Sequence, residues 1–267
     1  MRKISESEYL YYVPWARANT ANKVYPCSIA ERFQSGDIYV NDGDAVESVL
    51  FWHYCGFAYI SGTVSERIPG EILDDVCYGD RRRMLLITDD DLVINFFRQT
   101  DAEISTRIEY EHTGNVDIMP SYIDIRKIDS DNIHAITGRI IPSFSWKETE
   151  FLKNGYGYAA FDRERYCGTA FSAAVSSEEI DIGVEVHPDY RGRGIASALV
   201  QKMCAEAISQ GKKPVWAHGE TNTGSKHTAL RCGFIRKKVN SAICIKGGRV
   251  KMRNLSVFPK NRFQVKG

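Results

Sequence analysis

The clearest pattern in this chain is a strict alternation of apolar and polar residues from Glu179 to Val186. Isoleucine or valine stands at positions 180, 182, 184 and 186, and an acidic residue stands at 179, 181 and 185. Because successive side chains of a strand point to opposite faces, this pattern predicts a strand with one apolar and one acidic face. A basic, glycine-rich turn follows, and then an apolar stripe at helical spacing that stops at Gly211.

Further elements are expected around this unit. Alternation predicts strands over 122–128, 156–161, 167–175 and 214–218, with a polar hairpin turn over 162–165. Helical segments are expected after Pro142, over 146–154, and up to the Gly233-Phe234 pair. Strands that alternate with helices predict an α/β architecture for this part of the chain.

The first half of the chain is less regular. Strands are expected over 83–88 and 104–110, and the acidic run Asp89–Asp91 is expected to cap the start of a helix. The aromatic segment Val49–Ile60 is interpreted as the end of a helix followed by a buried strand. These elements predict an α+β region, in which no internal repeat and no catalytic motif is visible.

Composition and charge divide the chain in two. The 267 residues are 43% hydrophobic and 26% charged, which excludes a disordered chain and suits one large domain or two modest ones. Residues 1–117 carry 11 Lys and Arg against 20 Asp and Glu, a net charge of −9, and residues 118–267 carry a net charge of +10. The expected domains are therefore 1–117 and 118–267. Seven of the basic residues lie in the tail from Lys246 onward, so the second half has no nucleic-acid-binding patch of its own.

The cysteines, the N-terminus and the hydropathy indicate a cytoplasmic protein. The seven cysteines are odd in number, widely spaced and without a CxxC pair, which favours reduced thiols and no metal site. No run of eighteen apolar residues predicts a membrane span, and the charged N-terminus does not resemble a secretory signal.

The turn after the alternating strand has the chemistry of an anion site. Gly192 and Gly194 let the backbone approach a ligand closely, and the first helical turn offers unpaired N–H groups at the positive end of the helix dipole. Arg191 and Arg193 add positive charge that suits a pyrophosphate. Such a turn taken alone is equally often a simple tight connection.

The surrounding order of residues resembles the GNAT acyltransferase superfamily. Its motif A, Arg/Gln-x-x-Gly-x-Gly/Ala, is similar to Arg191-Gly192-Arg193-Gly194-Ile195-Ala196, and the resemblance extends over about residues 120–246. Downstream, Trp216, the segment Asn222–Ser225 and the segment Leu230–Phe234 match the asparagine after strand five and the Gly-Phe that closes the next helix. Details around both motifs resemble a bacterial branch related to zwittermicin-resistance acetyltransferases, which also carry an extra N-terminal domain.

The resemblance implies a GNAT fold, with a mixed and splayed central sheet, preceded by a smaller α+β domain. It also implies that acetyl-CoA binds in the opening between two splayed parallel strands. Backbone groups of the alternating strand would hold the thioester and pantetheine, amides of the turn and helix the pyrophosphate, and an asparagine the pantetheine. The implied cofactor-binding residues are Val184, Glu185, Val186, Arg191, Gly192, Arg193, Gly194, Ile195, Ala196, Ser197 and Asn222. The two valines are also expected to be core residues, and Asn222 is equally well explained as a helix N-cap.

The acid and the base are less clear from the sequence. Many GNAT enzymes protonate the leaving thiolate with a tyrosine on the helix after the asparagine, and this chain has Ala229 at that position. The candidates to bind or deprotonate the amine are Glu185 and Asp181, which share the acidic face of the strand, and His218 at the end of strand five. Ordinary surface charges and a structural histidine are the competing interpretations.

The leading hypothesis is an acetyl-CoA-dependent N-acetyltransferase that modifies a primary amine of a small molecule by direct attack in a ternary complex. Because Ala229 replaces the tyrosine, the alternative is a catalytically weak acyl-CoA-binding regulatory protein. Acetylation of nucleic acid or protein, guided by Arg81–Arg83 and the basic tail, is disfavoured because neither patch contains interleaved aromatic residues. A homodimer is compatible with the sequence, and the acceptor amine is not identified by it.

Overall fold

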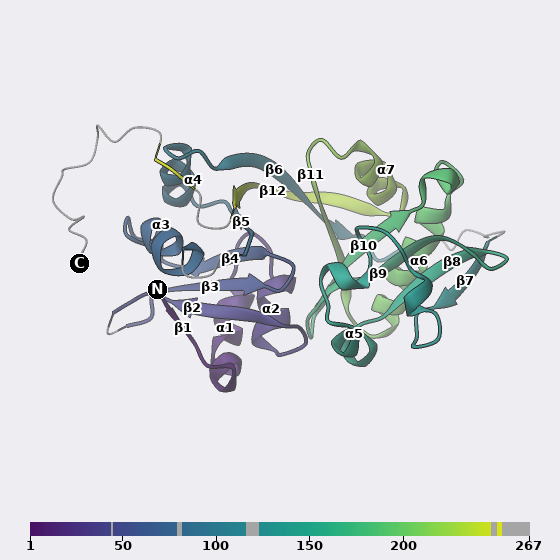
Figure 1. The fold of residues 1–267 in the computed structure, drawn as a ribbon, viewed down its shortest axis with the longest axis horizontal. Coiled ribbons are helices and arrows are strands. Elements are labelled where there is room, and N and C mark those ends of the chain that lie inside the picture. Colours follow the sequence, from purple (N-terminus) through teal and green to yellow (C-terminus); the bar gives the residue numbers. More distant parts are fainter. Residues whose placement is uncertain (44, 79–81, 116–122, 247–249, 253–267) are drawn as a thin grey trace.

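The computed structural model describes residues 1–43, 45–78, 82–115, 123–246 and 250–252, and its strands form one continuous mixed sheet (Figure 1). The strands are β1 (Arg2–Lys3), β2 (Gly36–Val40), β3 (Ser48–His53), β4 (Phe57–Gly62), β5 (Met84–Thr88), β6 (Glu103–His112), β7 (Asp124–Lys127), β8 (Gly157–Asp162), β9 (Arg165–Val175), β10 (Glu179–Val186), β11 (Lys213–Gly219) and β12 (Phe234–Ile245). The helices are α1 (Val13–Arg17), α2 (Val24–Ala30), α3 (Ile68–Glu71), α4 (Asp91–Arg98), α5 (Glu148–Asn154), α6 (Ile195–Ser209) and α7 (Thr223–Arg231). Shorter helical turns are η1 (Glu6–Tyr12), η2 (Ile72–Cys77), η3 (Ile133–Ala135), η4 (Pro142–Phe144) and η5 (Pro188–Tyr190). This arrangement confirms the expected α/β class with a mixed sheet.

The pattern of strand pairing is the same when the sheet is followed inward from either edge. The strand order runs β1-β2-β3-β4-β5-β12-β6-β11-β10-β9-β8-β7. From each edge, an antiparallel meander leads to a parallel pair, β4 with β5 on one side and β10 with β11 on the other. The strand beside each parallel pair then comes from the other half of the chain, because β12 pairs with β5 and β6 pairs with β11. The architecture therefore contains a structural repeat whose two units exchange their last strands.

This repeat was not visible in the sequence, because the two units share a topology without sharing residues. Only the second unit has a Gly-x-Gly turn after the first strand of its parallel pair; the first unit passes from Gly62 to α3 through Thr63–Arg67. The long strands β6 and β12 cross the middle of the molecule between the two units (Figure 1). The expected boundary near residue 117 lies outside the described residues, and the division into two independent domains stays a prediction.

Helix α2 joins the two units. Its sequence, VYPCSIA, has no charged residue, and all seven of its residues are buried. The side chain of Asn22 starts the helix by accepting a hydrogen bond from Val24 N–H at 3.0 Å. The helix packs against β2, β3 and β4 of the first unit and against β9 and β10 of the second. Its Tyr25 therefore reaches strands that are more than 140 residues away in the sequence.

Most of the expected elements are confirmed. The helix after the acidic run is α4, where the Asp90 side chain accepts from Val93 N–H at 3.0 Å, and the hairpin turns at Arg163 with φ +58°. The segment Val49–Ile60 is a correction: it forms the hairpin of β3 and β4, which turns at Gly56 with φ +91°, and no helix. Burial of β3 at every position removes the alternation that would have identified it.

The remaining expectations concern residues that the structure does not describe, the last strand, the cysteines and membrane-spanning helices. Tyr122, Arg81 and most of the basic tail are not described, so their expected roles stay predictions. Strand β12, after the Gly-Phe pair, was not predicted. None of the seven cysteines forms a disulfide bond, which agrees with the expected reduced thiols. None of the helices in the described ranges is long and apolar enough to cross a membrane.

Candidate active site

The site is built where two parallel strands separate. Strands β10 and β11 pair only from Glu179 with Lys213 to Asp181 with Val215. Beyond this point β10 continues to Val186 and β11 to Gly219 without pairing with each other. The gap opens into a cavity of about 940 Å³. The expected splay of the sheet is thus confirmed, and its vertex is at Asp181.

The outer end of this cavity is the glycine-rich turn before α6. Gly192 and Gly194 have φ of +75° and +80°, and no atom lies within 4 Å of where a Cβ on either residue would stand. The first backbone bond of the helix is Ala198 N–H to Gly194 C=O at 3.1 Å, and Gly194 supplies no side-chain cap. The amides of Ile195, Ala196 and Ser197 therefore have no helical partner and all three residues line the cavity.

The two arginines of the turn brace it. Arg191 Nε donates to Val186 C=O at 3.2 Å, and Arg193 Nη2 donates to Asp189 C=O at 2.9 Å. The Arg193 guanidinium also lies 5.1 Å from the centre of the Tyr190 ring. Arg191 lines the cavity and Arg193 does not, so Arg193 is the one predicted cofactor-binding residue that stands outside the lining. Both side chains are exposed and add positive charge near the turn.

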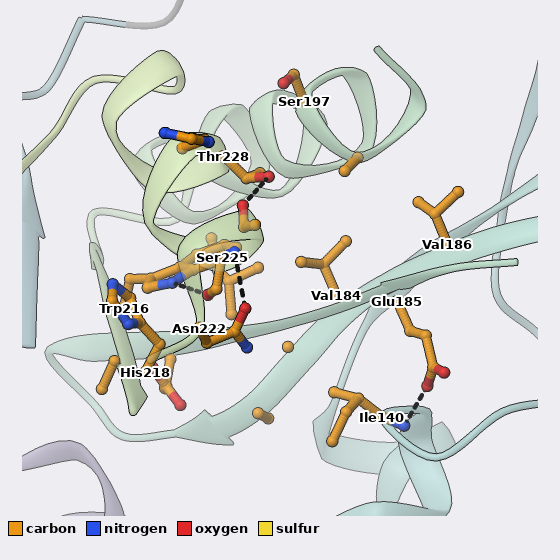
Figure 2. A pocket seen from close by; sticks show the side chains of 18 of the residues that line it. Ile140, Val184, Glu185, Val186, Ser197, Trp216, His218, Asn222, Ser225 and Thr228 are labelled. Atoms are coloured by element: carbon orange, nitrogen blue, oxygen red, sulfur yellow. Dashed lines mark hydrogen bonds between the residues drawn. The ribbon is translucent and has the colours of Figure 1, made fainter. Parts of the chain in front are cut away.

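Strand β10 presents different faces to the two sides of the gap. Val184 and Val186 point toward α6 and α7, whereas Glu185 points to the opposite side (Figure 2). Glu185 Oε2 accepts backbone N–H bonds from Arg139 at 2.7 Å and Ile140 at 2.5 Å. These bonds tie the loop before η4 to the strand, and the loop forms a wall of the cavity.

Asn222 combines the two roles that the sequence left open. Its Oδ1 accepts from Ser225 N–H at 3.0 Å and so caps α7. This bond fixes the side chain and leaves its amide nitrogen facing the gap (Figure 2). Ser225 Oγ accepts from Trp216 Nε1 at 3.0 Å, which leaves the serine hydroxyl proton available. Ala229 is fully buried in the core, and its neighbour Thr228 lines the cavity instead.

His218 also lines the cavity, but both of its ring nitrogens have partners. Nδ1 is 2.8 Å from the Gly219 carbonyl oxygen, and Nε2 is 3.1 Å from the hydroxyl of Tyr110. Because a carbonyl oxygen can only accept, Nδ1–H donates to Gly219, and Nε2 is paired with the Tyr110 hydroxyl. The ring stacks on Tyr110 and is 3% exposed. This environment is typical of a structural histidine.

Most residues at the inner end of the cavity were not assigned to a site from the sequence, and Asp181 is the exception. Tyr25, Phe57 and Arg107 come from the first half of the chain and line it together with Phe144 and Asp181. Tyr25 Oη donates a 2.7 Å hydrogen bond to Asp181 Oδ2, and Asp181 Oδ1 has no hydrogen-bond partner within the described part of the chain. The alternation pattern placed Asp181 on the polar face of the strand, but no local signal linked it to Tyr25.

The buried position of Asp181 changes its acidity. The side chain is 4% exposed, and this burial raises its pKa to about 6. The hydrogen bond from Tyr25 and the charge of Arg107 lower the pKa and oppose the effect, while Glu179 raises it. A carboxylate with a pKa near neutrality, at the vertex of the gap, has the properties of a general base. In the described ranges no three His, Cys, Asp or Glu side chains form a group suited to a metal ion.

Comparison with known proteins gives the same family as the motifs. Two relatives are mycothiol acetyltransferases: that of Nocardiopsis dassonvillei is 41% identical over 64 residues, 24% of this chain and 19% of the relative. That of Acidothermus cellulolyticus is 28% identical over 112 residues, 42% of this chain and 33% of the relative. The chain thus matches a third or less of the length of either protein.

Solved structures share the fold over nearly the whole chain. A GCN5-related N-acetyltransferase-like protein from Streptococcus suis has a TM-score of 0.69 at 20% identity, covering 90% of this chain and 99% of the other. A putative GNAT acetyltransferase from Novosphingobium aromaticivorans has a TM-score of 0.58 at 15% identity, covering 84% and 93%. The profile of the family described as GNAT acetyltransferase matches residues 18–242. Because this match includes most of both halves of the chain, the chain belongs to the GNAT acetyltransferase family.

Proposed function

We propose that this protein is an acetyl-CoA-dependent N-acetyltransferase that modifies a primary amine of a small molecule. The observation that carries the proposal is the cavity of about 940 Å³, which runs from the open glycine turn at one end to a buried carboxylate at the other. Such a cavity accommodates donor and acceptor together, which is what direct attack in a ternary complex requires. In the overall reaction an ammonium and an acetyl thioester give an amide, a thiol and one proton, as a C–N bond replaces a C–S bond.

The outer end of the cavity fits acetyl-CoA, the acetyl donor of this family. The space beside Gly192 and Gly194 admits a pyrophosphate close to the backbone, where the three unpaired amides of α6 can donate to it. Unpaired backbone groups of β10 along the gap suit the amide groups of pantetheine, and the fixed amide nitrogen of Asn222 faces the same gap. When bound, acetyl-CoA supplies an activated acetyl group.

Asp181 is the proposed acceptor of the amine proton. Its unpartnered Oδ1 lies at the vertex of the gap, and a pKa of about 6 leaves it ionised near neutral pH and able to attract an ammonium. Glu185 already accepts two backbone N–H bonds, and His218 has both nitrogens bonded. We therefore assign positioning roles to these two residues: Glu185 holds the loop over 139–140, and His218 holds the end of β11.

The leaving thiolate does not need a tyrosine in this proposal. Thiols ionise near pH 8.5, so a hydrogen bond to the sulfur is sufficient near neutral pH. The Ser225 hydroxyl, whose oxygen is already bonded to Trp216 Nε1, has its own proton to donate toward the cavity. Ala229 is therefore compatible with catalysis.

Thermal-shift screening with acetyl-CoA, followed by thiol release from acetyl-CoA across amino acids, polyamines and aminoglycosides, tests this function. We expect stabilisation by acetyl-CoA and turnover with at least one amine class, with intersecting initial-rate lines when both substrates are varied. Binding without thiol release from any amine would favour the catalytically weak regulatory protein instead. Parallel initial-rate lines would contradict the ternary complex.

A further inference from the structure

The inner end of the cavity contains two opposite charges that are not paired with each other. Asp181 receives its hydrogen bond from Tyr25, and Arg107 directs Nη2 to the Ala217 carbonyl oxygen at 3.4 Å. Asp181 Oδ1 and Arg107 Nε are both buried and lack a hydrogen-bond partner among the described residues. The Arg107 charge nevertheless lowers the pKa of Asp181, so the two groups lie within electrostatic range. Each retains capacity to bind a ligand of opposite charge.

Arg107 is held in place by the first half of the chain. Its guanidinium lies 4.7 Å from the centre of the Phe57 ring, a cation–π contact that fixes the plane of the group. Glu109, two residues along the same strand, does not neutralise it near pH 7, because burial raises the pKa of that carboxyl to about 8. The long bond to Ala217 uses one of the five guanidinium donors.

We propose that the acceptor is an amino acid or a close relative, an amine that also carries a carboxylate. This inference rests on the proposed function and deepens it, with the ammonium assigned to Asp181 and the carboxylate to Arg107. Asp181 both attracts the ammonium and takes its proton, whereas Arg107 binds and orients the acceptor without taking part in proton transfer.

The balance of charges favours such a zwitterion over other amines. A buried charge without a partner is costly, and a ligand with one charge of each sign satisfies both groups at once. A polyamine or an aminoglycoside would bring a second cation toward Arg107, which is repulsive. Phe57 and Phe144 line the same cavity and form an edge-to-face pair with centroids 5.9 Å apart, which suits the hydrocarbon part of an amino acid.

The experiment compares amino acids with their carboxamides, which keep the amine and the side chain but lose the carboxylate. Thiol release from acetyl-CoA is measured for both members of each pair. We expect kcat/KM to be tenfold to about a hundredfold higher for the acid than for the amide in the wild-type protein. The series glycine, β-alanine, 4-aminobutyrate and 6-aminohexanoate then shows which separation of the two charges the site prefers.

Two variants locate the carboxylate. Arg107→Gln should bring the acid and amide members to within threefold of each other, and Arg107→Lys should keep part of the preference. Arg139→Gln is the matched control, because this arginine also lines the cavity but is exposed at the loop beside Glu185. It should retain the preference. The dissociation constant for acetyl-CoA, measured by calorimetry, should not change in the Arg107 variants and so reports that they are folded.

The outcomes separate this inference from the proposed function. Turnover of polyamines or aminoglycosides with no preference for a carboxylate would overturn the inference and leave the N-acetyltransferase intact. Loss of the preference only in Arg139→Gln would also overturn it, since the carboxylate would then bind at the loop. Acetyl-CoA binding with no thiol release from any amine would overturn the proposed function itself.

Discussion

The hydroxyl of Tyr25 donates a 2.7 Å hydrogen bond to the carboxylate of Asp181, and this contact joins the two halves of the molecule at the vertex of the active-site gap. Tyr25 lies on the buried helix α2 of the first unit, and Asp181 is the last residue of β10 that pairs with β11. The first unit lacks a glycine-rich turn, but it supplies much of the inner wall of the cavity. Its role in the proposed reaction is therefore to complete the acceptor site.

Replacement of Tyr25 by phenylalanine should change the acidity of Asp181 while preserving the packing. The tyrosine bond lowers the pKa of Asp181, so its removal raises that pKa further. If Asp181 is the base, the acidic limb of the kcat/KM profile, expected near pH 6 in the wild-type protein, should move up by about half to one unit. The other groups that act on Asp181 are Arg107 and Glu179, and both remain in the variant.

Tyr9→Phe is the matched control for this prediction. Tyr9 also bonds a buried protein group through its hydroxyl, which donates to Gly36 C=O at 3.1 Å, but it lies in the first unit away from the cavity. This change should alter stability alone. A pH profile that is the same for Tyr25→Phe, Tyr9→Phe and the wild type would contradict the role of Asp181.

Asp181→Asn should stabilise the protein near neutral pH while abolishing most of its activity. Burial raises the pKa of this carboxyl from 3.8 to about 6 in the folded state. Between these values the unfolded chain is ionised and the folded protein keeps its proton, so stability falls as pH rises and the loss is complete above pH 6. Asparagine does not titrate, so at pH 7.5 the variant should unfold about 2–5 °C higher than the wild type.

The pH dependence provides the check. Below about pH 3 the wild-type aspartate is protonated in both the folded and the unfolded state, and the difference in Tm should disappear there. Thermal unfolding of both proteins from about pH 2.5 to about pH 8, followed by circular dichroism, measures this difference. The rate should fall by about 10²–10⁴ with every amine. A variant that is less stable than the wild type at pH 7.5 would mean that the charge is better paired than the structure indicates.

The second unit could be predicted from the sequence because its elements are amphipathic and its turns carry local signals. Strand β10 alternates apolar and polar residues along its length, and Gly211, with φ +70°, follows the end of α6 as its position in the sequence indicated. The residues proposed to bind acetyl-CoA come from two short segments of this unit, 184–197 and 222–225. Local patterns therefore indicated nearly all of the residues that the structure brings to this part of the cavity.

The acceptor side could not be predicted in this way. Tyr25 and Asp181 are 156 residues apart, and their contact depends on α2 packing across the junction of two units. Strand β3 and helix α2 are buried at every position, so their residues show no periodicity that would reveal a face. The strand exchange between β6 and β12 is likewise a long-range pairing for which no local residue pattern exists.

Gly194→Glu should abolish acetyl-CoA binding through both the side chain and its charge. The position has φ +80° and open space beyond the missing Cβ, so the new carboxylate would enter the proposed pyrophosphate site. Repulsion and loss of the backbone contacts should weaken binding well over tenfold, as measured by calorimetry.

Gly211→Glu separates this effect from backbone strain. Gly211 follows the same helix, has φ +70° and is also open beyond its Cβ, but it does not line the cavity. Both variants should lose similar stability, about 1–2 kcal/mol, because a side chain is disfavoured at positive φ. Only Gly194→Glu should lose acetyl-CoA. Equal affinities in the two variants would remove the turn from the donor site.

Glu185→Gln distinguishes a base from a residue that positions a loop. Glutamine keeps an oxygen that can accept the N–H groups of Arg139 and Ile140 but loses the charge that strengthens both bonds. A loosened loop should raise KM for the acceptor severalfold, while the shape of the pH profile and the affinity for acetyl-CoA stay as they are in the wild type. Glu185→Ala removes the acceptor oxygens altogether and should increase KM further, because neither N–H group of the loop would then be held. If instead Glu185→Gln lowers kcat by about 10²–10⁴ and eliminates the limb near pH 6, then Glu185 takes the proton and Asp181 serves to bind the ammonium.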